Sequence, residues 1–490
     1  DYGKKRIFFS DQKVILNSIR TKNKSLSKNI KLNIIQEQSQ VNLSNKILIK
    51  DASINSKLIK KNDIFFAIKG KNLDGNNYIS EAIKKKSSFV IVNRFNKNHP
   101  LSKQIKVKNT LKFLTTCSSI LRENINAKII SITGSCGKTT LKEMIGLVLK
   151  KISKTSFSPK SFNNKYGVPL SLFNMKQSDD FGVFEIGMDK KGEIDNLSKI
   201  IKPDLGLITN ISYAHSKNFK NIKQIADAKA EIMNNIKKNG IIVLNGDDHF
   251  FHYLKGLALK KKLKVISFAI NNKSSEIKLL NLKKTKNKYE LFLNINNNKF
   301  SFYTKNNNKN NLYNILAATA CITSFVNIKK LKKGIFLNIN IPKGRGNIFD
   351  VNFENKKIYF VDESYNSNPL SLKSSIENFE KLVLKKSKKY MFLGDMLELG
   401  KHSIKQHKLI SKIINKTKIN KVYVIGKHIK ETYKGLDPNK KAKILGNKLD
   451  MLKIIKDDFK TGDYLMVKGS NSTGLNKFII DLKQRRQNVI

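Results

Sequence analysis

The stretch from residue 129 to residue 140 most constrains how this chain can fold. Its apolar run at 129–132 has the β-branched character of a buried strand and breaks into a glycine turn at 134–137. Apolar residues then recur at helical spacing between Leu141 and Ile152. The pattern predicts a strand, a tight turn and an amphipathic helix. In that arrangement backbone N–H groups and a helix N-terminus surround a phosphate group.

The side chains after the turn suit a nucleoside triphosphate. Lys138 can neutralise phosphate charge, and a hydroxyl of Thr139 or Thr140 can bind Mg²⁺. The general P-loop has four residues between its glycines, whereas only two separate Gly134 from Gly137. Taken alone, the stretch therefore also fits an ordinary strand-to-helix turn.

The length and the order of the elements predict an α/β protein of three domains. A chain of 490 residues is long enough for about three domains. Strand and helix patterns alternate around the glycine turn and again after residue 343, which favours parallel sheets. Residues 274–309 alternate polar and apolar side chains and predict an antiparallel excursion. The predicted parts are a basic N-terminal extension (1–47), a small α/β domain (48–125), a central doubly wound parallel sheet with the P-loop (126–343) and a Rossmann-like domain without a GxGxxG motif (344–490).

The charge of the chain does not by itself indicate a nucleic-acid-binding protein. Lys and Arg exceed Asp and Glu by 95 − 37 = 58 residues, but the lysines are spread along the whole chain together with Asn, Ile and Phe. A genome rich in A and T explains this composition better than a binding patch. The three cysteines are isolated, which excludes a disulfide framework or a CxxC metal site. No apolar run reaches the ~18 residues of a membrane span, so we expect a cytoplasmic protein without membrane insertion.

Two further candidates follow strands of the predicted central sheet. Glu185 lies near a strand end, and His215 comes just after another strand. Open α/β sheets bind ligands at the carboxyl ends of their strands, so both side chains and the glycine turn are expected to converge. Lys229 lies on a predicted helix, where a lone lysine is normally solvated. In the third domain, polar loops at 362–369 and 468–471 follow strands and also fit simple helix caps.

Taken together, these stretches resemble the Mur ligases, the ATP-dependent amide ligases of peptidoglycan precursor synthesis. The short-spaced Thr-Gly-Ser-Cys-Gly-Lys-Thr-Thr is similar to the P-loop of that family, which accounts for its unusual spacing. This P-loop at 133–140 and four later stretches follow one another in the order of the family. The later stretches are residues 163–169, 185–187, 209–215 and 228–231.

Motifs of the third domain resemble one branch of the family. This branch joins D-alanyl-D-alanine to UDP-N-acetylmuramoyl-tripeptide. The Asp-Asn-Pro-Arg motif of the sibling MurE-type ligases is absent. The resemblance covers about residues 48–480 and rests in this domain on residues 365–369, 393–400 with Ser403 and His407, and 467–470.

The resemblance implies ATP and two Mg²⁺ ions as cofactors and an acyl-phosphate intermediate. It implies catalytic roles for Lys138, Lys229 and His215, with Lys229 carbamylated. Implied Mg²⁺ ligands are Thr139, Glu185, His215 and Lys229. Implied nucleotide contacts are Gly134, Ser135, Cys136, Gly137, Lys138, Thr139, Thr140, Asn164, Asn314, Arg345, Asp362 and Asn366. Implied substrate contacts are Asn55, Ser56, Lys57, Asn368, Lys468 and Ser470.

Two departures from the family pattern affect the adenine and dipeptide contacts. The usual Gly-Arg-His-Asn ahead of Asn314 is replaced by Asn-Lys-Asn-Asn at 308–311. The arginine that often follows Lys-Gly-Ser is Asn471.

The opening residues resemble the end of another ligase. The chain begins with Asp1, and residues 7–11 and 14–16 are similar to the C-terminus of a MurE-type ligase. We therefore expect a remnant of a fused MurE-type ligase ahead of a protein that is itself a monomer.

Two kinds of alternative function stay open at this point. One is a sibling amide ligase, either MurE-type or a folylpolyglutamate synthase. The other is a basic nucleic-acid-binding ATPase. The sequence also leaves open whether the tripeptide ends in meso-diaminopimelate or lysine.

Overall fold

Contacts between Cα atoms group the chain into two units. The computed structural model describes residues 30–487 except 340–341, 354 and 383–386. The first unit is Asp1–Ala127 with Lys165–Asp179, and the second is Lys128–Asn164 with Asp180–Ile490. The residues similar to a MurE-type C-terminus, 7–11 and 14–16, lie outside the described part.

The first unit contains a four-stranded parallel sheet in the order β1-β2-β3-β4. Its short inner strands are apolar on both faces, as expected for parallel strands covered on both sides. Its elements are β1 (Ala52–Ser53), β2 (Ile64–Phe66), β3 (Phe89–Val92), β4 (Gln104–Lys106), α2 (Ile30–Ser39), α3 (Ile79–Lys84), α4 (Thr110–Glu123) and α6 (Gly167–Phe173).

Helix α2 lies within the range that the sequence analysis assigned to the N-terminal extension. It buries Leu32, Ile34 and Ile35 and packs against α4. The sequence hid this helix, because its apolar residues are few and stand among lysines and asparagines. Residues 30–39 are therefore a packed element of the first unit.

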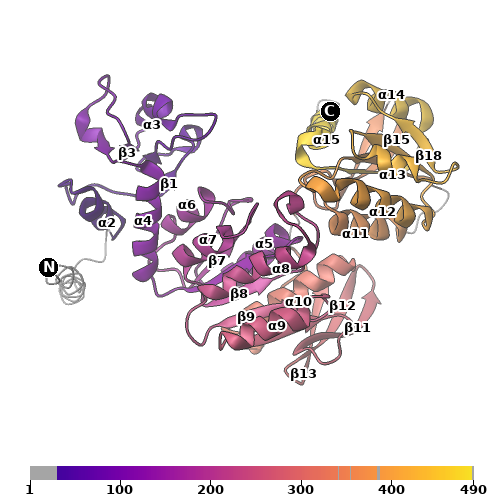
Figure 1. Ribbon diagram of the computed structural model, residues 1–490, viewed down its shortest axis with the longest axis horizontal. Coiled ribbons are helices and arrows are strands. Elements are labelled where there is room, and N and C mark those ends of the chain that lie inside the picture. The colour runs from indigo at the N-terminus through magenta and orange to yellow at the C-terminus, as the bar shows by residue number, and fades with distance from the viewer. Residues whose placement is uncertain (1–29, 340–341, 354, 383–386, 488–490) are drawn as a thin grey trace. The chain divides into compact units, whose positions relative to one another are not determined.

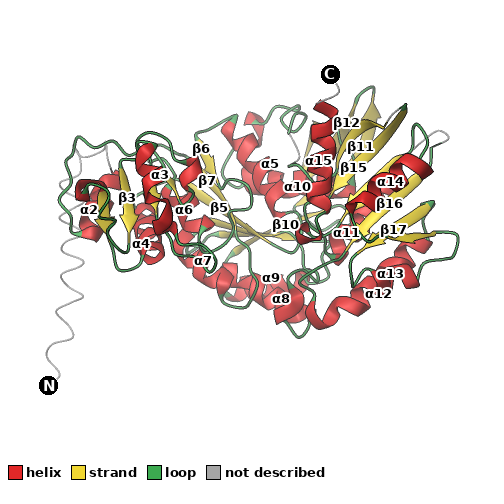
Figure 2. Ribbon diagram, turned by 90° about the horizontal axis from the view of Figure 1, so that it is seen from above, coloured by secondary structure: helices red, strands yellow, loops and turns green. Residues whose placement is uncertain are grey.

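The central sheet of the second unit has nine strands in the order β13-β12-β11-β10-β9-β8-β5-β7-β6. Strands β5 to β10 pair in parallel, and helices cover both faces (Figure 2): α5 and α10 lie on one side and α7, α8 and α9 on the other. The strands are β5 (Lys128–Thr133), β6 (Thr155–Phe157), β7 (Phe181–Glu185), β8 (Leu205–Ile208), β9 (Ile241–Asn245) and β10 (Lys264–Ala269). The helices are α5 (Lys138–Lys150), α7 (Glu193–Ile201), α8 (Ile222–Ala230), α9 (Phe251–Lys260) and α10 (Lys309–Thr323).

The predicted antiparallel excursion is present at one edge of this sheet. Strand β11 (Ile277–Thr285) pairs in parallel with β10, and β12 (Lys288–Ile295) and β13 (Asn298–Thr304) then add as antiparallel hairpins. Helix α10 covers this edge with buried Ile315, Leu316 and Ala318.

A six-stranded sheet in the order β14-β15-β19-β16-β17-β18 completes the second unit (Figure 1). Successive side chains of a strand point to opposite faces of the sheet, so they pack into two separate hydrophobic cores. Tyr390 and Phe392 pack with α14 and α15, while Met391 and Leu393 pack with α11 and α12. The elements are β14 (Asn347–Phe353), β15 (Lys356–Glu363), β16 (Lys389–Gly394), β17 (Lys421–Ile425), β18 (Lys441–Ile444), β19 (Tyr464–Lys468), α11 (Pro369–Glu380), α12 (Ser403–Asn415), α13 (Lys430–Lys434), α14 (Lys448–Asp458) and α15 (Leu475–Gln487).

These sheets confirm the predicted α/β class with its parallel central sheet and Rossmann-like C-terminal sheet. The helices in the described part of the chain all fall short of the length and apolar character that a bilayer crossing requires.

Asn174 links the segment 165–179 to strand β1 within the first unit. Its side-chain Oδ1 accepts from Ala52 N at 2.7 Å, and its Nδ2 donates to Ala52 O at 2.9 Å. We expect Asn174→Ala to lower the unfolding free energy of the first unit by ~1–3 kcal/mol, because two hydrogen bonds of β1 are lost. Hydrogen exchange of amides in the first unit measures this, with the exposed Gln177→Ala as the control. Unchanged protection in Asn174→Ala would contradict the role of this residue.

Candidate active site

A cavity of about 600 Å³ in the second unit collects most of the predicted site residues. The loops after β5, β6, β8 and β9 and the last residue of β7 form one part of its wall, and residues of the C-terminal part form another. The carboxyl ends of parallel strands therefore meet at one place, as the open α/β architecture requires.

The glycine turn takes its shape from contacts with the loop after β8. Gly134 and Gly137 have φ angles of 139° and 83°, and Gly137 is the N-cap of α5. A Cβ atom on Gly134 would lie 1.9 Å from Thr209 Oγ1. Asn210 fixes the turn further, because its Oδ1 accepts from Cys136 N at 2.9 Å. The two-residue gap thus forms a turn that leads directly into the N-terminus of α5, which suits a phosphate.

Two lysines beside this turn have lowered pKa values. Lys138 Nζ donates to Gly134 O at 2.8 Å. Withdrawal from water lowers the pKa of Lys138, and the charge of Glu185 opposes that shift. Lys229 on α8 is 2% exposed, and burial followed by the nearby charge of Lys138 holds its pKa well below the usual range. Among the described residues, none accepts a hydrogen bond from Lys229 Nζ, so a neutral amine is favoured here.

Oxygen atoms gather around Glu185 at the end of β7. Glu185 is 1% exposed; its Oε2 accepts from Thr139 Oγ1 at 2.7 Å and its Oε1 from Asn163 Nδ2 at 2.7 Å. Arg345 of the C-terminal part donates from Nη2 to Thr139 Oγ1 at 3.1 Å, and its buried Nε has no partner among the described residues. Carboxylate and hydroxyl oxygens are the ligands that Mg²⁺ prefers. The free Nε points to an anion as the missing partner of Arg345.

His215 belongs to a second cluster of side chains that could bind a metal ion, together with Asp189 and Glu398. Its backbone is left-handed, with φ 53°, and its Nδ1 is 3.3 Å from Asp189 Oδ1 and 2.5 Å from Glu398 Oε2. One ligand atom from each residue lies within 4.8 Å of the others. This set of one imidazole and two carboxylates is chemically able to hold a cation.

A fully buried lysine holds the loop that supplies Asn163. Lys142 on α5 is 0% exposed, and its Nζ donates to the backbone carbonyls of Ser158 and Lys160, the latter at 2.6 Å. The same Nζ is 2.9 Å from Glu143 Oε1. Lys142 therefore ties the P-loop helix to the loop at 158–163.

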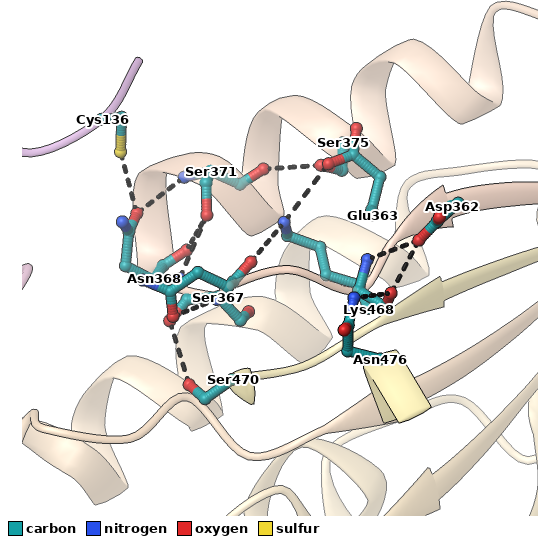
Figure 3. A network of polar contacts seen from close by, with 12 residues as sticks. Cys136, Asp362, Glu363, Ser367, Asn368, Ser371, Ser375, Lys468, Ser470 and Asn476 are labelled. Carbon is teal, nitrogen blue, oxygen red and sulfur yellow. Dashed lines mark hydrogen bonds and ion pairs between the residues drawn. The ribbon is translucent and has the colours of Figure 1, made fainter. Parts of the chain in front are cut away.

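The C-terminal wall of the cavity is a connected polar network (Figure 3). Asn368 caps α11 by accepting from Ser371 N at 2.9 Å, and it also accepts from Cys136 Sγ at 3.0 Å. Lys468 is 2% exposed; it donates to Asn366 O at 3.1 Å and lies 3.5 Å from Glu363 Oε2.

Many of the residues singled out from sequence line this cavity. They are Ser135, Cys136, Gly137, Lys138, Thr139, Thr140, Glu185, His215, Asn314, Arg345, Asn366, Asn368 and Lys468.

Other predicted residues do not line it. Asn164 is exposed, and its neighbour Asn163 is the one that contacts Glu185. Asp362 is buried and pairs with Lys483 at 2.6 Å. Ser470 accepts from Leu397 N at 2.9 Å, which holds the loop at 394–400. These side chains have structural partners that a sequence does not display.

The residues predicted to contact the substrate at the N-terminal end lie in the first unit. Asn55 accepts from Lys57 N at 3.0 Å and caps a short 3₁₀ turn. Ser56 donates to Glu81 Oε2 at 2.6 Å, and Lys57 is exposed.

The end of the cavity near Asn314 contains contacts that the sequence analysis did not single out. Tyr313 donates to Asp247 Oδ2 at 2.8 Å, and Asp247 also accepts from Ile270 N and Asn272 N. Asn311 donates to Thr304 Oγ1 and Asn306 O, so its amide supports the backbone at the start of α10. The altered Asn-Lys-Asn-Asn stretch thus begins α10 and leaves Asn314 on the cavity wall.

Comparison with known proteins gives the same picture over nearly the whole chain. Residues 132–322 match the Mur ligase middle domain, and residues 345–471 match the Mur ligase, glutamate ligase domain. The UDP-N-acetylmuramoyl-tripeptide–D-alanyl-D-alanine ligase of Rickettsia prowazekii is 32% identical over 446 residues, which are 90% of this chain and 96% of the relative. The same ligase of Buchnera aphidicola from Acyrthosiphon pisum is 32% identical, covering 89% and 94%.

Two solved structures share the fold. MurF from Acinetobacter baumannii has a TM-score of 0.79 at 24% identity and covers 92% of this chain and 98% of its own. The MurF ligase from Thermotoga maritima in complex with ADP has a TM-score of 0.73 at 22% identity, with 91% and 100% covered.

The anchoring of the loop at 158–163 is testable with Lys142→Met. This variant keeps the volume but leaves two carbonyls without their donor, so we expect faster amide exchange across the loop and an unfolding free energy lower by ~1–3 kcal/mol. Lys150→Met, on an exposed site of the same helix, serves as the control. Exchange at wild-type rates in Lys142→Met would show that the loop does not depend on this lysine.

Proposed function

The chain belongs to the Mur ligase family, and from that premise we infer that it is a MurF-type ligase. It joins D-alanyl-D-alanine to UDP-N-acetylmuramoyl-tripeptide with ATP, giving the UDP-linked pentapeptide of peptidoglycan synthesis. The observation that carries this conclusion is the 32% identity over 90% of the chain to a ligase of that activity. The third-domain motifs at 365–369 and 393–400 point to the same branch.

The first half of the reaction is phosphoryl transfer. A carboxylate oxygen of the tripeptide attacks the γ-phosphorus of ATP, the bond to the leaving ADP oxygen breaks, and an acyl phosphate forms. We propose that the glycine turn and Lys138 hold the phosphates and that Arg345 binds a transferring oxygen. The unpartnered Nε of Arg345 supports this role. Such fixed donors stabilise charge that builds up on the phosphoryl group.

The oxygen-rich groups suit Mg²⁺, which offsets phosphate charge when it is bound. We propose Thr139 and Glu185 as ligands of one ion, supported by their oxygens at 2.7 Å from one another. His215 and carbamylated Lys229 are proposed ligands of a second. Carbamylation requires a neutral amine, and the lowered pKa of Lys229 supplies one.

The second half of the reaction is amide formation. The amine of D-alanyl-D-alanine attacks the acyl carbon, and inorganic phosphate leaves with the electron pair of the broken C–O bond. We propose that the loops at 365–369 and 468–470 bind the dipeptide, with Asn368, Lys468 and Ser470 in that part. Exclusion of water matters here, since hydrolysis would waste the acyl phosphate.

The first unit is proposed to hold the UDP-muramoyl peptide through the loop at 55–57. We further propose that the domain boundaries in the sequence lie near residues 125 and 343 and that the enzyme acts as a monomer in the cytoplasm. Fusion to a MurE-type ligase stays a prediction about the residues ahead of 48.

A phosphate-release assay tests the function directly. With ATP, Mg²⁺ and UDP-N-acetylmuramoyl-tripeptide, we expect D-alanyl-D-alanine to stimulate phosphate release, and diaminopimelate, lysine, glutamate or RNA to leave it unchanged. Lys138→Ala should lower the rate by about 10³-fold or more while the protein stays folded, because it loses a phosphate contact. Running both the diaminopimelate and the lysine tripeptide identifies the preferred third residue. No response to the dipeptide in the wild-type protein would refute a MurF-type activity.

Carbamylation of Lys229 is testable by ¹³C NMR with labelled bicarbonate. The lowered pKa keeps this amine neutral at a pH where an exposed lysine is charged, so a carbamate signal should appear near neutral pH and fade on acidification. We expect the signal and ligation to be lost in Lys229→Arg and kept in Lys223→Arg, whose side chain is 60% exposed on the same helix. A carbamate signal that persists in Lys229→Arg would sink this assignment.

A further inference from the structure

We propose that Glu363 binds the ammonium group of D-alanyl-D-alanine and takes up its proton before the amine attacks. The inference rests on the proposed function and deepens it, because it assigns the amino end of the acceptor to one carboxylate. Glu363 is the last residue of β15 and lines the cavity.

The neighbouring strand provides Glu363 with a cationic partner. Glu363 and Lys468 are paired residues of the parallel strands β15 and β19, and their charged groups are 3.5 Å apart. Figure 3 shows Lys468 reaching toward Glu363 along the C-terminal wall. Lys468 also donates a hydrogen bond to Asn366 O, so only some of its N–H groups are left for the Glu363 carboxylate.

The Glu363 carboxylate can accept more hydrogen bonds than it now does, unlike the carboxylates of Glu185 and Asp247 at the strand ends of the central sheet. Among the described residues, Lys468 alone approaches the Glu363 carboxylate as an ion-pair or hydrogen-bond donor. In contrast, Glu185 accepts from Thr139 and Asn163, and Asp247 accepts from several backbone N–H groups and a tyrosine. An ionised carboxylate has about four acceptor positions, so Glu363 can accept a further donor without losing an existing one.

Glu363 also lies near the phosphate-binding end of the cavity. A Cβ atom built on Gly346 would be 3.4 Å from Glu363 Oε1. The preceding residue, Arg345, donates to Thr139 Oγ1 at the start of α5. Glu363 thus lies beside Gly346, and the residue before that glycine is Arg345, which is proposed to bind a transferring phosphoryl oxygen.

The chemistry of the acceptor requires a group of this kind. A free α-amino group has a pKa of about 8, so the dipeptide arrives mostly as an ammonium ion, which has no lone pair. One proton passes to Glu363, and the nitrogen lone pair then attacks the acyl carbon to form the C–N bond of a tetrahedral intermediate. When the C–O bond to phosphate breaks, the phosphate leaves with that electron pair and takes up the second proton, so an amide, hydrogen phosphate and a protonated Glu363 result. Solvent later returns Glu363 to its ionised form.

The variant Glu363→Gln separates the two halves of the reaction. Without dipeptide, hydroxylamine traps the acyl phosphate as a hydroxamate, which reports the first half alone. We expect hydroxamate formation within about twofold of the wild type and kcat/KM for D-alanyl-D-alanine lower by about 100-fold or more. Thermal unfolding and ATP affinity are measured on the same samples.

A second glutamate offers a matched control. Glu290 pairs with Lys333 at 3.6 Å with a side chain 15% exposed, compared with 3.5 Å and 19% for the pair of Glu363, and it does not line the cavity. Glu290→Gln should leave both half reactions unchanged. If Glu363→Gln fails to fold, Glu363→Asp keeps the charge on a shorter side chain and should raise KM for the dipeptide with normal hydroxamate formation.

Other outcomes overturn the inference. A fall of hydroxamate formation in parallel with ligation, or a changed Mg²⁺ requirement, would place Glu363 in the first half reaction. Normal kcat/KM for the dipeptide in a folded Glu363→Gln or Glu363→Asp protein would remove it from the mechanism. Failure of the wild-type protein to ligate the dipeptide would instead refute the proposed function itself.

Discussion

The buried carboxylate of Glu185 is the constraint on which the rest of the site depends. A charge that is 1% exposed is stable only when it is hydrogen-bonded and faces a positive charge. Thr139 and Asn163 supply the hydrogen bonds, and Lys138 supplies the charge. Lys138 and Thr139 lie at the start of α5 and Asn163 lies in the loop at 158–163, so satisfying one carboxylate fixes the P-loop helix, the end of β7 and that loop relative to one another.

Two buried lysines surround this carboxylate site. Lys142 is fully buried and ends on two backbone carbonyls, so it fixes the loop that supplies Asn163. Burial and the nearby charge of Lys138 lower the pKa of Lys229 and favour its neutral form, which is the form that reacts with CO₂. In the described part of the chain few lysines are buried, and Lys142, Lys229 and Lys468 are among them. Exposed lysines contribute little to any one site, because water screens them.

Local patterns in the sequence were enough to predict most of the fold and the phosphate-binding end of the site. The strand and glycine turn at 129–137 predicted β5 and the start of α5, because one continuous stretch of chain forms both. Contacts between distant segments were not predictable in that way. Asn163 was missed in favour of Asn164 because adjacent asparagines look alike until the loop is anchored. Glu363, Glu398 and Asp189 gained significance only when their strands and loops met.

The two sheets of the second unit contribute unlike chemistry to one cavity. The central sheet supplies the turn, Lys138 and Glu185, which suit phosphate and metal, whereas the C-terminal sheet supplies Arg345, Glu363 and Lys468. Direct contacts join the two sets: Arg345 to Thr139, Asn368 to Cys136, and Tyr365 to Ser161 at 2.7 Å. A ligase that makes an acyl phosphate must present the acceptor before water reaches it. Because the C-terminal part provides both Arg345, which completes the phosphate site, and Glu363, which binds the amine, the acceptor site is tied to the same contacts that complete the phosphate site.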